Sequence, residues 1–233
     1  MSPLLLSLAL AAAAGQPATY VAIGDSTGAG MGGSRGGYPD RLAERLGRAG
    51  LPVRLLNLCY PGARARDALR LQLPRALAAR PRLVTVGIGI NDVLRGTDLD
   101  EYRRELEELA RQLEATGARV LLVNLPDLGL SPRVTMAEPP AEVRAQVQAA
   151  NQVLAEVAAR HRFELVDLFG PGASLYGADG TLAADLFHPS DEGYDRWAAA
   201  AEPAARRALA PEGRQRRGTP RRGDRAPAQA GAR

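Results

Sequence analysis

Short apolar runs alternate with longer amphipathic stretches along this chain. The apolar runs are rich in Val, Leu and Ile, which is typical of buried strands, and they cover residues 19–23, 53–58, 83–88, 119–124 and 163–168. Apolar residues spaced three and four apart predict helices over residues 40–49, 64–79, 98–115 and 141–159, and one more after Ser190. We expect Pro74 to break the second helix. This alternation predicts an α/β fold, a three-layer α/β/α sandwich with a central parallel sheet of about five strands.

The domain organisation follows from the length and the two ends of the chain. A length of 233 residues without internal repeats indicates one domain, which we place at residues 16–210. Residues 1–15 carry an apolar run ending in Ala12-x-Ala14, a pattern of signal-peptide cleavage sites. We therefore expect a signal peptide and a secreted or periplasmic protein. The run is too short for a stable membrane span, which needs about 20 apolar residues.

The alternative for the N-terminal segment is a first helix packed on the domain of a cytoplasmic protein. The observation that favours this alternative is the missing positive charge, because no Lys or Arg precedes Arg35. N-terminal sequencing of the protein from its host distinguishes the two, since an intact Met1 in a cytosolic fraction would exclude cleavage.

The positive charge of the chain is concentrated at its C-terminal end. Residues 211–233 hold seven arginines against Glu212 and Asp224, a net charge of +5, so the other 210 residues carry −1 of the total of +4. This segment is rich in Pro, Gly and Arg, and we expect a disordered tail. The nearly neutral domain argues against a nucleic-acid partner. The single cysteine, Cys59, excludes an intramolecular disulfide, and we interpret it as a small packing side chain.

The candidate nucleophile is Ser26, in the sequence Gly24-Asp25-Ser26-Thr27 that directly follows the first predicted strand. Functional groups gather at the carboxyl ends of strands in open α/β sheets. A serine hydrolase also needs a base, and the chain has only His161 and His188. His161 falls at the end of a predicted helix, where we expect a structural role. His188 lies in a loop three residues after Asp185, a spacing that lets the carboxylate orient the imidazole.

Three groups are candidate donors for the oxyanion that forms during acyl transfer. The backbone N–H of Ser26 would lie at a helix N-terminus, where the dipole favours negative charge. Gly62 follows the second strand and would let a substrate approach its N–H closely. Asn91, after the third strand, offers a neutral side-chain amide. Each of the last two also fits a structural role, as a turn glycine or a helix cap.

Taken together, these residues resemble the SGNH/GDSL hydrolase superfamily. Its markers are a serine in a Gly-Asp-Ser block, a glycine, an asparagine in Gly-x-Asn-Asp and a histidine in Asp-x-x-His; Ser26, Gly62, Asn91 and His188 match them in order. The resemblance covers about residues 19–205 and implies a flavodoxin-like fold. It also implies an ester hydrolase with Ser26, Asp185 and His188 as the triad, an oxyanion hole of Ser26, Gly62 and Asn91, and no cofactor or metal. Thr27 stands where the superfamily commonly has leucine.

The expected substrate is a small-molecule, lipid or glycan ester, and we expect a monomer. The same fold also carries thioesterases and carbohydrate acetyl esterases. Two long predicted loops, 125–140 and 170–184, would wall the pocket. Their apolar residues suggest an acyl site or, alternatively, core packing: Leu128, Leu130, Leu175 and Tyr176. Short to medium acyl chains are expected.

Two other functions match parts of the sequence less well. Gly28-x-Gly30-x-x-Gly33 matches a dinucleotide fingerprint, but the second strand ends in Asn57-Leu58-Cys59-Tyr60 without the acid that binds the ribose. A catalytically idle glycan- or lipid-binding module of the same fold would have lost a member of the triad.

Overall fold

The computed structural model describes residues 16–210, and its centre is a sheet of five strands. The strands are β1 (Ala18–Gly24), β2 (Val53–Asn57), β3 (Leu83–Gly87), β4 (Arg119–Val123) and β5 (Glu164–Val166). Their order is β2-β1-β3-β4-β5, and each neighbouring pair is parallel. The predicted parallel sheet of about five strands is therefore confirmed.

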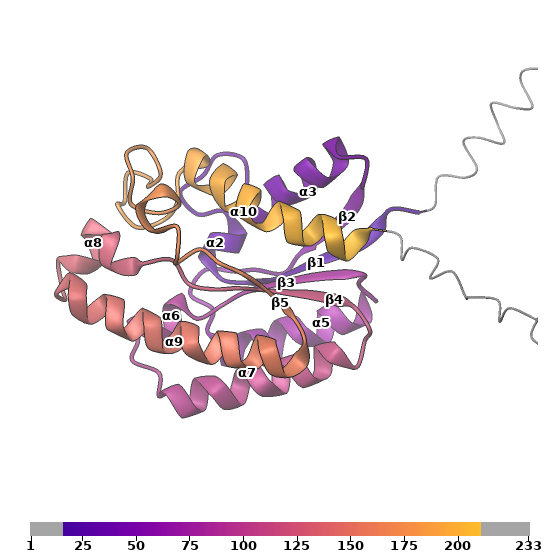
Figure 1. The fold of residues 1–233 in the computed structure, drawn as a ribbon, viewed down its shortest axis with the longest axis horizontal. Coiled ribbons are helices and arrows are strands. Elements are labelled where there is room, and N and C mark those ends of the chain that lie inside the picture. The colour runs from indigo at the N-terminus through magenta and orange to yellow at the C-terminus, as the bar shows by residue number, and fades with distance from the viewer. Residues whose placement is uncertain (1–15, 211–233) are drawn as a thin grey trace, which may run out of the picture.

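Helices cover both faces of this sheet (Figure 1). One face packs against α3 (Tyr38–Arg48) and α10 (Asp191–Leu209), and the other against α5 (Leu73–Ala78), α7 (Leu99–Glu114) and α9 (Pro140–His161). The predicted helices 40–49, 98–115 and 141–159 and the predicted helix after Ser190 are confirmed. Ser190 is the N-cap of α10, since its side chain accepts a hydrogen bond from the N–H of Gly193. The sandwich has the three layers that the sequence pattern predicts.

Short helical segments follow the carboxyl ends of the strands. They are α2 (Ser26–Ala29) after β1, α4 (Ala65–Asp67) after β2, α6 (Ile90–Leu94) after β3, η2 (Leu128–Leu130) and α8 (Pro132–Thr135) after β4, and η3 (Gly172–Ser174) after β5. All five parallel strands end at the same edge of the sheet, so the residues of these segments meet there.

The core explains why the strands read as continuous apolar runs. Tyr20, Val21, Ala22 and Ile23 of β1 are all fully buried, because helices cover both sides of the strand. The helices bury one stripe each; in α7 it consists of Tyr102, Leu106, Leu109, Ala110 and Leu113.

The expected break at Pro74 takes a different form in the structure. Between α4 and α5 the chain stays helical through a π-helical turn, η1 (Ala68–Gln72), and Pro74 is one of the first residues of α5. The widened turn removes the clash between a proline ring and the carbonyl four residues earlier, so the helix continues instead of ending.

Two of the sequence-based predictions concern segments outside the described residues. These are the signal peptide at residues 1–15 and the disordered tail at residues 211–233. Within residues 16–210, no helix combines the length and the apolar character that crossing a membrane requires.

Candidate active site

Ser26 is the first residue of α2, directly after β1. Asp25 is the N-cap of α2, and its Oδ1 accepts hydrogen bonds from the N–H of Thr27 at 2.9 Å and from the Thr27 hydroxyl at 2.8 Å. Thr27, the departure from the usual leucine, thus gives this buried carboxylate a second donor. The Ser26 N–H lies in the first turn of the helix, where backbone donors have no intrahelical acceptor.

A buried glutamine holds the end of β1 in place. The Gln72 side chain accepts from the N–H of Gly24 and donates to its carbonyl, both at 2.8 Å. Gln72 is only 2% exposed and comes from the π-helical turn η1. This two-bond contact was not predicted, because the two residues lie 48 positions apart and belong to no local pattern.

Close packing between α2 and the end of β2 depends on small side chains. A Cβ added at Gly28 would lie 2.3 Å from Sγ of Cys59, so only glycine fits there. Burial raises the pKa of the Cys59 thiol well above its ordinary value, in agreement with its interpretation as a packing side chain. The glycines at 28, 30 and 33 do not open a long helix, since α2 ends with Gly30 as its C-cap; the dinucleotide interpretation is therefore wrong.

The structure brings Ser26, His188 and Asp185 together in one hydrogen-bonded chain. His188 Nε2 lies 3.0 Å from Ser26 Oγ, and His188 Nδ1 lies 2.5 Å from Asp185 Oδ2. The Asp185 carboxylate also accepts the N–H groups of Phe187 and His188 at 3.1 and 2.9 Å. Partial burial alone would raise the pKa of Asp185, but these bonds outweigh it and hold the pKa below its ordinary value. Asp185 is therefore ionised at neutral pH.

Gly62 and Asn91 lie next to one another at the same edge of the sheet. The Asn91 side-chain amide donates to the carbonyl of Ala63 at 3.0 Å, which uses one of its two hydrogens. Gly62 adopts a φ of +79°, a conformation that favours glycine. Asn91 belongs to the first turn of α6, but the N-cap of that helix is Gly89, so Asn91 is not the helix cap that the alternative interpretation suggests.

His161 lies far from this site, at the end of α9 and just before β5 begins. Its Nδ1 is 2.8 Å from Glu114 Oε2 and its Nε2 is 3.0 Å from Glu107 Oε2, both on α7. Partial burial lowers the pKa of His161, but the bonds to the two glutamates outweigh it and raise the pKa above its ordinary value. His161 thus joins two helices, as its predicted structural role requires. Within residues 16–210, no three His, Cys, Asp or Glu side chains are grouped so that they could hold a metal ion.

Two buried carboxylates beside the triad serve the backbone. Asp25 caps α2, and Asp92 Oδ2 accepts the N–H of Ala65 at 3.0 Å at the start of α4. Burial raises the pKa of each from 3.8 to about 6, because the charged form loses its hydration. Both contacts agree with the structural role that the Gly-Asp-Ser and Asn-Asp blocks suggest for these aspartates.

The buried Asp25 predicts a pH-dependent stability that the Asp25→Asn variant should remove. A raised pKa means that ionisation costs stability in the folded state, so this stability is fully present below about pH 4 and is lost as the pH rises through about 6. Asparagine can keep the N-cap bond without titrating. The free energy of unfolding of the wild type minus that of Asp25→Asn should therefore fall by roughly 2 to 2.5 kcal/mol between pH 4 and pH 7. Urea titrations at several pH values measure this difference, and a difference independent of pH would contradict the prediction.

Comparisons with known proteins agree with this geometry. The family model of the GDSL-like Lipase/Acylhydrolase family matches residues 22–196. Esterase TesA of Pseudomonas aeruginosa is 32% identical over 196 residues, which covers 82% of this chain and 90% of that protein.

Solved structures give the same result. A crystal structure of TesA superposes with a TM-score of 0.68 at 27% identity and covers 82% of this chain and 99% of its own. A lipase/acylhydrolase from Enterococcus faecalis superposes with a TM-score of 0.66 at 24% identity and covers 80% of this chain and 94% of its own; at this identity the likeness concerns the fold.

Proposed function

Because the chain belongs to the GDSL-like lipase/acylhydrolase family and is a carboxylic ester hydrolase, we propose that it acts through an acyl-enzyme on Ser26. The observation that carries this proposal is the chain of contacts from Ser26 Oγ through His188 to Asp185, with distances of 3.0 and 2.5 Å. Ser26 is largely buried, with an exposed fraction of 6%. The proposal excludes an idle binding module, whose signature would be a broken triad.

The first half of the reaction transfers the acyl group to the enzyme. His188 Nε2 accepts the Ser26 hydroxyl proton while Oγ attacks the ester carbonyl, and the carbonyl oxygen becomes an oxyanion. The N–H groups of Ser26 and Gly62 and the second hydrogen of the Asn91 amide stabilise this charge. The imidazolium of His188, stabilised by Asp185, then protonates the leaving alcohol oxygen as the C–O bond breaks.

The second half releases the acid. His188 accepts a proton from a water molecule, the resulting hydroxide attacks the acyl-enzyme, and the same donors stabilise the second oxyanion. When the bond to Ser26 Oγ breaks, His188 returns its proton to Ser26.

Two mainly apolar cavities suggest where the acyl chain binds, because the smaller one is lined by Phe187, the residue before His188. The smaller, of about 280 Å³, is lined by Leu94, Arg133, Val134, Ala137, Glu138 and Phe187. Phe187 precedes His188, and its ring lies edge-on to the imidazole with a centroid separation of 4.7 Å. One wall residue of the smaller cavity therefore contacts His188.

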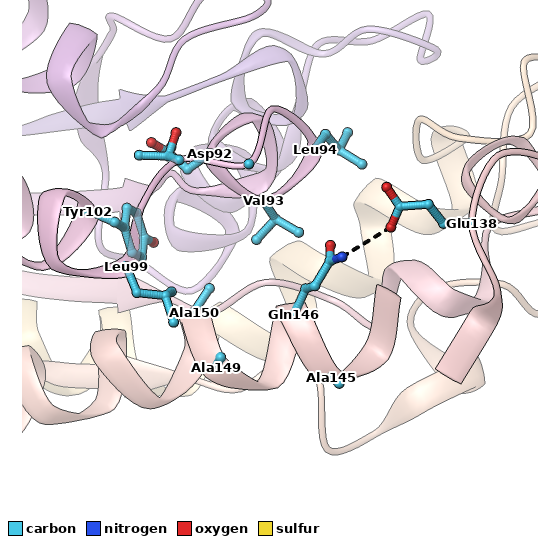
Figure 2. Close-up of a pocket in the computed structure, with 12 residues that line it drawn as sticks. Asp92, Val93, Leu94, Leu99, Tyr102, Glu138, Ala145, Gln146, Ala149 and Ala150 are labelled. Carbon is cyan, nitrogen blue, oxygen red and sulfur yellow. Dashed lines mark hydrogen bonds between the residues drawn. The ribbon is translucent and has the colours of Figure 1, made fainter. Parts of the chain in front are cut away.

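The larger cavity, of about 520 Å³, continues from the smaller one, since Leu94 and Glu138 line both. It lies between α6 and the first half of α9 (Figure 2), and its walls include Val93, Leu99, Ala145, Ala149 and Ala150. Figure 2 also shows the hydrogen bond of 3.1 Å from Gln146 to Glu138 at one end. The predicted loop 125–140 does contribute to the smaller cavity, through Arg133, Val134, Ala137 and Glu138. The four apolar loop residues suggested for the acyl site do not line either cavity, and Leu128 and Tyr176 are buried in the core instead. We propose that an unbranched acyl chain of medium length lies along Phe187 and Leu94 and ends against Ala149.

Filling the larger cavity should shorten the preferred acyl chain. The Ala149→Phe variant places a ring in the cavity, so kcat/KM toward p-nitrophenyl octanoate and decanoate should fall by about 10- to 100-fold, since each buried methylene contributes roughly 0.8 kcal/mol. Activity toward the acetate and butyrate should stay within about twofold. Ala141→Phe, an exposed position of the same helix outside the cavity, is the matched control.

The same panel of substrates tests the two alternative activities, carbohydrate acetyl esterase and thioesterase. Acetylated xylan and an acyl thioester are assayed beside the p-nitrophenyl esters. The proposed acyl site would be contradicted if the wild type prefers acetylated xylan, or if Ala149→Phe lowers kcat/KM equally for esters of every chain length. Neither result would bear on the Ser26 mechanism.

A further inference from the structure

The backbone of residues 185–188, here termed the catalytic turn, adopts an unusual conformation. Leu186 has a φ of +59° although it is not a glycine, and its side chain is 48% exposed. Leucine rarely adopts this left-handed conformation, so contacts with the rest of the protein must hold it. Inside the turn, Asp185 already accepts the N–H groups of Phe187 and His188. The carbonyl groups of the turn have to find partners elsewhere.

Two buried hydroxyl groups supply these partners. Ser131 Oγ donates to the carbonyl of Leu186 at 2.7 Å, and Tyr176 Oη donates to the carbonyl of Phe187 at 2.7 Å. Both side chains are buried, with exposures of 0% and 2%. We refer to them as the hydroxyl pair.

The hydroxyl pair comes from the two long loops that follow β4 and β5. Ser131 is the N-cap of α8, which fixes its position, and the ring of Tyr176 packs against Trp197 of α10 with a centroid separation of 6.2 Å. The backbone N–H of Arg133, also in α8, lies 3.4 Å from the carbonyl of Leu186. Two segments that are distant in sequence thus contact successive peptide groups of the catalytic turn, one on each side of Phe187.

The orientation of these two peptide groups decides where the imidazole lies. The Phe187–His188 peptide bond is the backbone link that precedes the His188 side chain. Along the backbone, Leu186 and Phe187 separate Asp185 from His188, so the two peptide groups set the relative positions of the two side chains. A rotation of either peptide would move Asp185 Oδ2 relative to His188 Nδ1, or His188 Nε2 relative to Ser26 Oγ. A displacement of about 1 Å in such a contact can cost a factor of 10² in rate.

We propose that Ser131 and Tyr176 are positioning residues of this hydrolase, whose hydroxyl groups orient Asp185 and His188 by binding the two carbonyls between them. The proposal rests on the proposed function, because it assigns a role toward the Asp185–His188 pair. It also gives the two long loops a function in catalysis beyond walling a pocket.

Ser131→Ala and Tyr176→Phe test this proposal, since each removes one hydroxyl and leaves the packing. Each variant should lower kcat for a p-nitrophenyl ester by about 10- to 100-fold and change KM by less than about twofold, because the substrate contacts stay intact. The proton between His188 Nδ1 and Asp185 gives a downfield signal in proton NMR when this bond is short and charge-assisted. In both variants the signal should weaken or move upfield.

The matched control is Tyr20→Phe, which removes a buried hydroxyl bonded to Thr85 Oγ1 at 2.9 Å, far from the catalytic turn. This variant should lose stability but keep kcat and the NMR signal. If Ser131→Ala does not fold, Tyr176→Phe alone decides, because its ring still packs against Trp197. A kcat within twofold of the wild type in the folded variants, with or without a raised KM, would overturn the proposal. Labelling with a fluorophosphonate distinguishes a failure of the proposed function from a failure of the positioning role. Failure to label Ser26 in the wild type contradicts the proposed function, whereas slow labelling of Ser26 in the variants supports the positioning role.

Discussion

Replacing Ser26 or His188 with alanine should lower kcat by about 10⁴- to 10⁶-fold, and the double variant should lose little more than either single variant. Ser26 Oγ and His188 Nε2 are 3.0 Å apart, so the hydroxyl loses its base when the imidazole is removed, and the imidazole has no nucleophile to activate when the hydroxyl is removed. Two residues that act as one unit give this strongly non-additive result. Single-turnover and steady-state kinetics with a p-nitrophenyl ester measure it.

Matched controls exist for both substitutions. Ser174 is exposed, and its hydroxyl donates to the carbonyl of Pro171 at 2.9 Å, so Ser174→Ala should keep full activity. His161→Ala removes the contacts with Glu107 and Glu114 and should lower the melting temperature while kcat stays close to that of the wild type. Independent losses that multiply in the double variant would contradict a shared role of Ser26 and His188.

Replacing Asn91 with alanine should lower kcat by about 10²- to 10³-fold, equivalent to roughly 3 to 4 kcal/mol of lost transition-state stabilisation. The Asn91 amide uses one hydrogen on the carbonyl of Ala63, which fixes its direction, and its other hydrogen is the donor that we propose for the oxyanion. KM should change little, since the full negative charge develops only in the transition state. Asn91→Asp keeps the size but replaces the donor with a negative charge, so its loss should be at least as large.

The control for this prediction is Asn151 on α9, whose side chain forms two hydrogen bonds of 2.8 and 2.9 Å with the backbone of Leu125. Asn151→Ala should lower stability without a comparable loss of kcat. An Asn91→Ala variant with a raised KM and an unchanged kcat would show that Asn91 binds the ground state and does not stabilise the oxyanion.

The fold could be predicted because its signals are local. Strands buried on both faces read as apolar runs, and helices buried on one face read as a repeat of three and four residues. Both signals depend on neighbours in sequence, which is why the order and bounds of the elements agree with the structure to within a few residues. Pro74 is an exception to prediction from local patterns, since a widened helical turn accommodates a proline that would break a regular helix.

The grouping of Ser26, His188 and Asp185 could be predicted for a related reason. Ser26 follows a strand, His188 is one of only two histidines, and Asp185 lies on the same turn as His188. The residues that support the site could not be found in this way. Gln72 contacts Gly24 across 48 positions, and Ser131 contacts Leu186 across 55, so each depends on the three-dimensional packing and leaves no pattern in the sequence. The positive φ of Leu186 could not be predicted either, because a leucine in the sequence does not indicate a left-handed conformation.

The central claim, that Ser26 becomes acylated, is tested most directly by mass spectrometry of the protein after treatment with a fluorophosphonate. The reagent reacts with an activated serine hydroxyl and remains attached, as a stable analogue of the acyl-enzyme. We expect one adduct, on the peptide that contains Ser26, together with complete loss of esterase activity, and no adduct on Ser26→Ala. An adduct on any other residue, or a Ser26→Ala variant that still hydrolyses esters at the wild-type rate, would contradict the mechanism.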